Sequence, residues 1–273
     1  MIRLTALFLP LLLGPSGAPD PAPGPIPVEF QTADGVTVHG WYMHAGEHFA
    51  ADGHEHAPAH FASQPAVVLL HMYGGDKSDW GPLFGDLRQR GIASLAIDLR
   101  GHGESVLGAG GEDLAARARE RDPALFRAMW QDAQGAADWL VARGHRVERI
   151  GLLGASVGCS VAIDAARRNP ELRVAGVLTP GQNYLGVPTL EHLKEWGGRQ
   201  LLVVSSGEEW AGGAGPVVEA LAQADGSRVG FWRLPGAGIH GTRMLAKVEG
   251  IQPRLAAWFE AALAAPALME PSR

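Results

Sequence analysis

Short, continuous apolar runs recur along the chain and alternate with longer segments in which apolar residues return at helical spacing. Such runs are typical of strands that are buried on both faces of a parallel sheet. They predict strands at 66–70, 93–97, 150–153, 174–178, 201–204 and 229–234. This alternation predicts an α/β protein with a mostly parallel central sheet and helices on both of its faces.

Two further patterns complete the predicted elements. Runs of strand-forming residues at 28–32 and 36–43 flank Asp34-Gly35, a dipeptide typical of tight turns. They predict an antiparallel hairpin at the leading edge of the sheet. Helices are predicted at 78–91, 122–143, 157–168, 189–196, 216–224 and 252–264. Pro123 near its first turn and Gly144 as its stop delimit the longest of them.

The beginning of the chain differs in composition from the rest. A positively charged start precedes a short apolar segment at 4–13, which is typical of a secretory signal and too short to span a bilayer. We expect residues 1–18 to be a signal peptide, 19–27 to be a Pro-rich linker, and the protein to be secreted or periplasmic. Pro19 disfavours cleavage directly before it, so a disordered leader or a misassigned start codon remains an alternative.

The remaining chain fits one α/β domain at 28–265 with a tail at 266–273. The 273 residues carry a net charge of -6 and no long basic run, so we expect no nucleic-acid partner, and we expect no stable membrane span. Cys159 is the only cysteine, which excludes an internal disulfide and a cysteine-linked lipid at the N-terminus. We expect it to be a small buried packing residue.

A polar, Ala-rich insertion at 46–65 is rich in histidine. Neutral imidazoles bind zinc, nickel or copper, so a metal site is one interpretation. No cysteine accompanies the histidines and no ligand spacing recurs, which favours a solvated loop. We therefore expect no metal. The histidines concerned are His44, just before the insertion, and His48, His54, His56 and His60 within it.

The candidate chemistry begins at Gly154-Ala155-Ser156-Val157-Gly158, which follows an apolar run and precedes small residues at helical spacing. A strand, a sharp turn and a helix with Ser156 at the apex would expose the serine hydroxyl above the carboxyl end of the strand. The first N–H groups of the helix, Val157 among them, could receive an anion there. The pentad predicts a nucleophile.

Two later features complete a catalytic pattern. Glu208-Glu209 follows the predicted strand at 201–204, and His240 lies in a glycine-rich loop near the end of the chain. The order serine, acid, histidine resembles that of the α/β-hydrolase fold. Leu69 to Gly75 and Gly236-Ala237-Gly238 most resemble the dienelactone-hydrolase-like and serine-esterase branches. Dienelactone hydrolases proper use a cysteine nucleophile, so the serine favours a carboxylesterase.

The resemblance implies a role for each residue. Ser156 would be the nucleophile, His240 the base, and Glu209 or its neighbour Glu208 the orienting acid. Tyr73, the second residue after a histidine that follows a strand, would donate its backbone N–H to an oxyanion hole together with Val157, with Met72 as the alternative donor.

The resemblance also implies what lies outside the catalytic set. The segment at 98–105 would hold its loop, so Asp98 and His102 are expected to be structural. The segment between the strand at 174–178 and Gln200 is too short for a large lid domain, and Gln182 and Asn183 offer no carboxylate after that strand.

The predicted reaction is hydrolysis of a small-molecule ester through an acyl-enzyme, with no cofactor. A serine peptidase or an acyltransferase would use the same triad, and a non-catalytic binding protein on the same fold is a third possibility.

Overall fold

The computed structural model describes residues 24–45, 64–224 and 228–264. Its centre is an eight-stranded sheet with the order β1-β2-β4-β3-β5-β6-β7-β8. β1 pairs antiparallel with β2 and β2 pairs antiparallel with β4, whereas all later pairs are parallel. The strands are β1 (Ile26–Gln31), β2 (Thr37–Met43), β3 (Ala66–Leu70), β4 (Ala93–Ile97), β5 (Ile150–Ala155), β6 (Val174–Leu178), β7 (Gln200–Ser206) and β8 (Arg228–Leu234).

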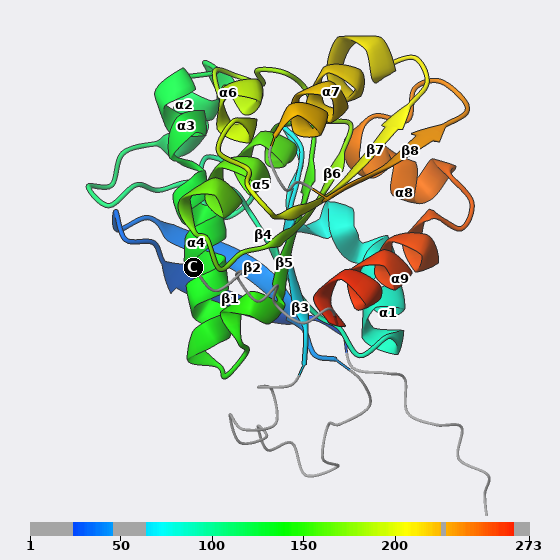
Figure 1. Cartoon of the computed structure of the whole chain (residues 1–273). Coiled ribbons are helices and arrows are strands. Elements are labelled where there is room, and N and C mark those ends of the chain that lie inside the picture. Colours follow the sequence, from blue (N-terminus) through cyan, green and yellow to red (C-terminus); the bar gives the residue numbers. More distant parts are fainter. Residues whose placement is uncertain (1–23, 46–63, 225–227, 265–273) are drawn as a thin grey trace, which may run out of the picture.

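Helices cover both faces of this sheet (Figure 1). Short helices α2 and α3, together with α4, α5, α6 and α7, lie over one face, and α1, α8 and α9 lie over the other. Their bounds are α1 (Gly81–Gln89), α2 (Leu114–Arg119), α3 (Pro123–Ala128), α4 (Trp130–Ala142), α5 (Val157–Arg168), α6 (Thr189–Leu193), α7 (Gly215–Gln223), α8 (Met244–Lys247) and α9 (Ile251–Ala264).

The hydrophobic core is split by the sheet into two clusters. Leu140 of α4 and Ala162 of α5 belong to the first, and Leu83 of α1 and Phe259 of α9 belong to the second. All residues of β3, β4, β5 and β6 are buried, because helices cover both faces of these strands. The continuous apolar runs of the sequence arise from this two-sided burial. The fold class predicted from the sequence is confirmed, and no large lid domain occurs in the described chain.

The turn between β5 and α5 depends on two glycines. A Cβ on Gly154 would lie 2.1 Å from the carbonyl oxygen of Gly158, and a Cβ on Gly158 would lie 2.2 Å from that of Leu70 in β3. The first turn of α5 therefore packs directly on the backbone at the ends of β3 and β5. Any larger residue at either position would push α5 away from the sheet.

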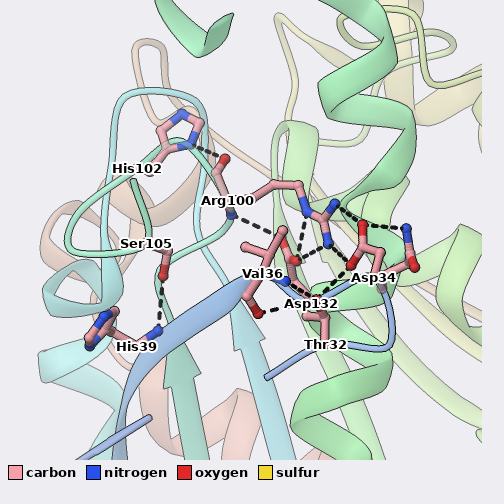
Figure 2. A network of polar contacts seen from close by, with 9 residues as sticks. Thr32, Asp34, Val36, His39, Arg100, His102, Ser105 and Asp132 are labelled. Atoms are coloured by element: carbon pink, nitrogen blue, oxygen red, sulfur yellow. Dashed lines mark hydrogen bonds and ion pairs between the residues drawn. The ribbon is translucent and has the colours of Figure 1, made fainter. Parts of the chain in front are cut away.

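A buried ionic network holds the loop after β4 (Figure 2). Arg100 donates from its Nε and its backbone N–H to Asp132 of α4 at 2.8 and 2.9 Å, and its two terminal nitrogens bind Asp34 of the β1–β2 turn at 2.6 and 3.0 Å. Burial raises the pKa of Asp132, and Arg100 opposes that rise. Ser105 accepts the backbone N–H of His39 at 2.9 Å, which links the end of the same loop to β2.

The two residues of this loop that could have been taken for a catalytic pair are structural. Asp98 is fully buried and accepts hydrogen bonds from the backbone N–H of Lys77 at 2.8 Å and from its Nζ at 2.6 Å. His102 packs edge-on against the rings of His71 and Tyr73. The structure thus agrees with the expectation that Asp98 and His102 hold the loop.

His71 connects this loop to β3. Its Nδ1 donates to the carbonyl oxygen of Met72 at 2.7 Å, and its Nε2 accepts the backbone N–H of Leu99 at 3.0 Å. Both ring nitrogens are used by the neutral imidazole, and a second ring proton would face the Leu99 N–H group. Burial, with the neighbouring His102, lowers the pKa of His71 to about 4, against an ordinary value of 6.5.

Two helix predictions were wrong in their bounds. The single helix expected at 122–143 is interrupted at Met129, where the N–H group bonds to the carbonyl of Phe126 in a tighter turn. The break lets α3 and α4 pack in different directions. Phe126 of α3 contacts the rings of Tyr73 and His102, whereas α4 lies along the sheet. The helix expected at 189–196 ends at Leu193, and α2 and a π-helical turn at Trp210–Ala214 were not predicted.

Several sequence predictions fall outside the described residues and stay predictions. They are the signal peptide, most of the linker, the four histidines of the insertion and the C-terminal tail. His44 is described, and its ring packs edge-on against Tyr42 of β2. Among the described residues, no helix is both long and apolar enough to cross a membrane.

We expect Gly154→Ala to destabilise the protein by about 3 kcal/mol or more, because a core cannot absorb a Cβ that close to backbone. The matched control is Gly85→Ala in α1, where an added Cβ meets nothing within 4 Å. Alanine there should stabilise the helix by about 0.5–1 kcal/mol. Urea unfolding of both variants checks this, and equal stabilities would contradict the role given to Gly154.

The low pKa of His71 predicts that the folded state loses stability in acid. The unfolded chain binds a proton at His71 below pH 6.5, whereas the folded chain does so only near pH 4. The free energy of unfolding should therefore fall between pH 6.5 and 4, with His71 accounting for up to about 3 kcal/mol. His71→Gln removes this titration and should flatten the dependence in urea unfolding across that range. An unchanged pH slope in the variant would refute the assignment to His71.

Candidate active site

Ser156 occupies the strained turn that the pentad predicts. The backbone of Ser156 has φ 52° and ψ -115°, and only 7% of the residue is exposed to solvent. A positive φ is uncommon for a residue with a side chain and is costly unless the surroundings enforce it. Here the N–H of Ser156 donates to the carbonyl of Leu178 in β6 at 3.0 Å. The serine thus sits at the carboxyl edge of the sheet, between β5 and α5.

The structure brings Glu209 to His240. The Nδ1 of His240 lies 2.9 and 2.8 Å from the two carboxylate oxygens of Glu209, in the turn that follows β7. Glu208 is exposed and only accepts the N–H of Gly238 at 3.3 Å. Of the two carboxylates that the sequence left open, Glu209 is therefore the one paired with the histidine.

The loop that carries His240 lies against the serine turn. A Cβ on Gly241 would be 3.6 Å from the Cβ of Ala155 and 3.0 Å from the sulfur of Met72. The residue after the histidine thus contacts both the residue before Ser156 and the loop after β3. Elements from four places in the chain meet at this edge of the sheet.

Two backbone N–H groups near this site find no acceptor among the described residues. Within the described part of the chain, neither the N–H of Tyr73 nor that of Val157 makes a hydrogen bond. The ring of Tyr73 packs edge-on against His102 and beside Phe126, with the guanidinium of Arg121 5.5 Å away. The tyrosine side chain is therefore engaged in packing.

Tyr184, which sequence reasoning did not select, also belongs to this site. Its ring lies edge-on to His240, with centroids 6.3 Å apart, and its hydroxyl donates to the carbonyl of Thr179 at 3.3 Å. Burial raises the pKa of Tyr184 to about 12, with Cys159 and Glu209 adding to the rise and the hydroxyl of Ser156 opposing it. Its position just after β6, beside Gln182 and Asn183, was the only available signal.

A pocket of about 510 Å³ opens beside Glu209. One side of this pocket is lined by the segment after β6, which includes Tyr184, and another side by the turn after β7. The Nε2 of Gln182 donates to the carbonyl of Gly212 at 3.0 Å and so links the two sides. The lining residues are Gly181, Gln182, Asn183, Tyr184, Glu208, Glu209, Gly212 and Gly213.

Cys159, on the first turn of α5, is fully buried. Its sulfur donates to the carbonyls of Gly154 and Leu178, both at 3.2 Å. Burial raises the pKa of its thiol well above the usual range. The thiol therefore packs behind the serine turn, as expected from the sequence.

The family model described as "Serine aminopeptidase, S33" matches residues 62–194 of the chain. An uncharacterized protein of Mycobacterium tuberculosis is 28% identical over 162 residues, which are 55% of this chain and 48% of that protein. The chain thus spans about half the length of the curated relatives it matches.

Solved structures resemble most of the chain in fold. An esterase of Pyrococcus furiosus is 17% identical with a TM-score of 0.61, covering 88% of this chain and 91% of its own. The dienelactone hydrolase of Anabaena variabilis is 20% identical with a TM-score of 0.58, and the match covers 88% of this chain and 97% of that protein. A cold-adapted esterase from an Arctic intertidal metagenomic library is 19% identical with a TM-score of 0.59, and the match covers 86% of this chain and 92% of that protein.

The strand order, the turn at Ser156 and these similarities agree on one architecture. The chain has the α/β-hydrolase fold.

Proposed function

We propose that this protein is a serine hydrolase that cleaves carboxylic esters through an acyl-enzyme. Ser156 is the nucleophile, His240 the general base and Glu209 the acid that orients it. The observation that carries the proposal is the pairing of Glu209 with Nδ1 of His240, in a loop packed against the strained turn at Ser156.

The pairing defines the chemistry of the imidazole. A serine hydroxyl is a weak nucleophile at neutral pH and needs a base that takes its proton during attack. When Nδ1–H of His240 donates to Glu209, Nε2 carries the lone pair that can accept this proton. The carboxylate then stabilises the imidazolium. The same Nε2–H protonates the departing alcohol, and water releases the acyl group by the reverse sequence.

The unpartnered N–H groups fit the role of an oxyanion hole. Attack on the ester carbonyl places negative charge on its oxygen, and the N–H groups of Val157 and Tyr73 are the donors we assign to it. Each such donor typically contributes about 3 kcal/mol in the transition state. Val157 is the first residue of α5, so the helix dipole also favours the negative charge. Met72 is the alternative to Tyr73.

A serine aminopeptidase is the second candidate. The matching family model carries that description, and Glu208 places an exposed carboxylate on the wall of the pocket beside Glu209, where it could bind a free amino group. The solved relatives include two esterases, which favours esters. Assays with an amino-acid p-nitroanilide beside p-nitrophenyl esters separate the two candidates.

The test compares p-nitrophenyl esters from acetyl to long acyl chains on the wild type and four variants. We expect Ser156→Ala and His240→Ala to lower kcat by about 10⁴-fold or more. Glu209→Gln should lower it by about 10²–10⁴-fold, because an amide cannot fix the tautomer or stabilise the imidazolium. Glu208→Gln is the matched control, one residue away and without the contact to His240, and should retain activity within about threefold.

A fluorophosphonate probe provides the second measurement. The wild type should become covalently labelled at Ser156, as judged by mass spectrometry of the modified peptide, and Ser156→Ala should not. A wild type that turns over no ester or anilide and takes no label would refute the proposal. A larger loss in Glu208→Gln than in Glu209→Gln would refute the assignment of the acid.

A further inference from the structure

Thr179, directly after β6, is held in a conformation that a threonine rarely adopts. Its φ is 55°, in the left-handed region, and its side chain is fully buried. A β-branched residue at positive φ is an outlier, because its Cβ substituents crowd the backbone. Such strain persists only where the surrounding structure enforces it, and it concentrates at functional sites.

The hydroxyl of Thr179 faces the histidine loop. Its Oγ1 accepts the backbone N–H of Gly241, the residue after His240, at 2.7 Å. It donates its own proton to the carbonyl of Leu178 at 2.7 Å, while the N–H of Thr179 donates to Val204 of β7 at 2.7 Å. The hydroxyl is therefore fixed in direction, with its lone pair turned to Gly241.

The carbonyl of Leu178 is shared with the serine turn. Besides the Thr179 hydroxyl it accepts the N–H of Ser156 at 3.0 Å and the thiol of Cys159 at 3.2 Å. A short path of hydrogen bonds thus leads from Ser156 through Leu178 and Thr179 to Gly241. It connects two segments of the chain that are more than 80 residues apart in sequence.

We propose that Thr179 is a positioning residue that sets His240 relative to Ser156. The inference rests on the proposed function, because it assigns the hydroxyl a role only if these two residues react together. Nothing else in the described chain accepts the N–H of Gly241. The neighbouring Thr242 donates its hydroxyl to Asp79 at 3.2 Å on the other side of the loop. Without the Thr179 hydroxyl, the histidine loop would still be attached through Thr242 and Asp79, but His240 would be free to shift.

The experiment compares kcat and KM for a p-nitrophenyl ester, the rate of phosphonate labelling and the melting temperature in three variants of Thr179. Thr179→Val keeps the shape but not the hydroxyl. A displacement of about 1 Å at a catalytic group lowers rates by about 100-fold, so kcat and labelling should fall by this order while KM changes little. Thr179→Ser keeps the hydroxyl and should restore both rates to within about threefold.

The third variant of Thr179 and one control at another threonine separate an effect on positioning from an effect on stability. Thr179→Gly adopts positive φ freely and so remains folded, yet lacks the acceptor, and it should lose as much kcat as the valine variant. Thr189→Val is the matched control: Thr189 is equally buried, and its hydroxyl bonds to that of Ser160 at 2.7 Å, away from the histidine loop. We expect it to lower the melting temperature but leave kcat near that of the wild type.

Each outcome has one meaning. Reduced kcat and labelling in Val and Gly, with rescue by Ser and an active Thr189→Val, support the positioning role. Wild-type rates in Thr179→Val or Thr179→Gly, or no rescue by Ser, overturn it while the proposed function stands. A wild type that neither hydrolyses esters nor takes the phosphonate label overturns the proposed function and this inference with it.

Discussion

The close approach of α5 to the ends of β3 and β5 is the constraint on which the site depends. At Gly154 and Gly158 the backbone of the helix touches the backbone of the strands, with no side chain between them. Ser156 lies between these contacts, and the positive φ at the serine follows from the tight connection. The strain is local, but the packing that maintains it comes from two helical layers around a sheet whose central strands are fully buried.

The buried charges have a different role from the apolar core. Arg100 and Lys77 are both nearly buried, and removing a charge from water costs more than a buried ion pair usually returns. Their carboxylate partners, Asp132 and Asp98, hold the loop after β4 against α4 and against the loop after β3. The loop after β3 also carries Tyr73. We infer that these pairs define the geometry of the loops around the site more than they stabilise the fold.

The sequence predicts the centre of the fold well because burial on both faces leaves an unambiguous signal. β3, β4 and β6 begin and end where their apolar runs do. The interruption at Met129 left no such signal, since methionine favours helices and no glycine or proline marks the break. Glu208 and Glu209 are chemically equal in the sequence. Only the direction of the chain after β7 decides which of them meets His240.

The end of β6 shows what sequence reasoning could not reach. Some proteins of this fold carry their acid after this strand, but here the sequence has Gln182 and Asn183, which offer no carboxylate. The sequence therefore predicts no role for this segment. In the structure the same strand end supplies Thr179 and Tyr184, one bonded to the histidine loop and the other packed against His240. The carboxylate that pairs with His240 follows β7, and the end of β6 instead joins the serine turn to the histidine loop. A threonine at positive φ has no sequence signature, since its conformation depends on hydrogen bonds to β7 and to the loop before α8.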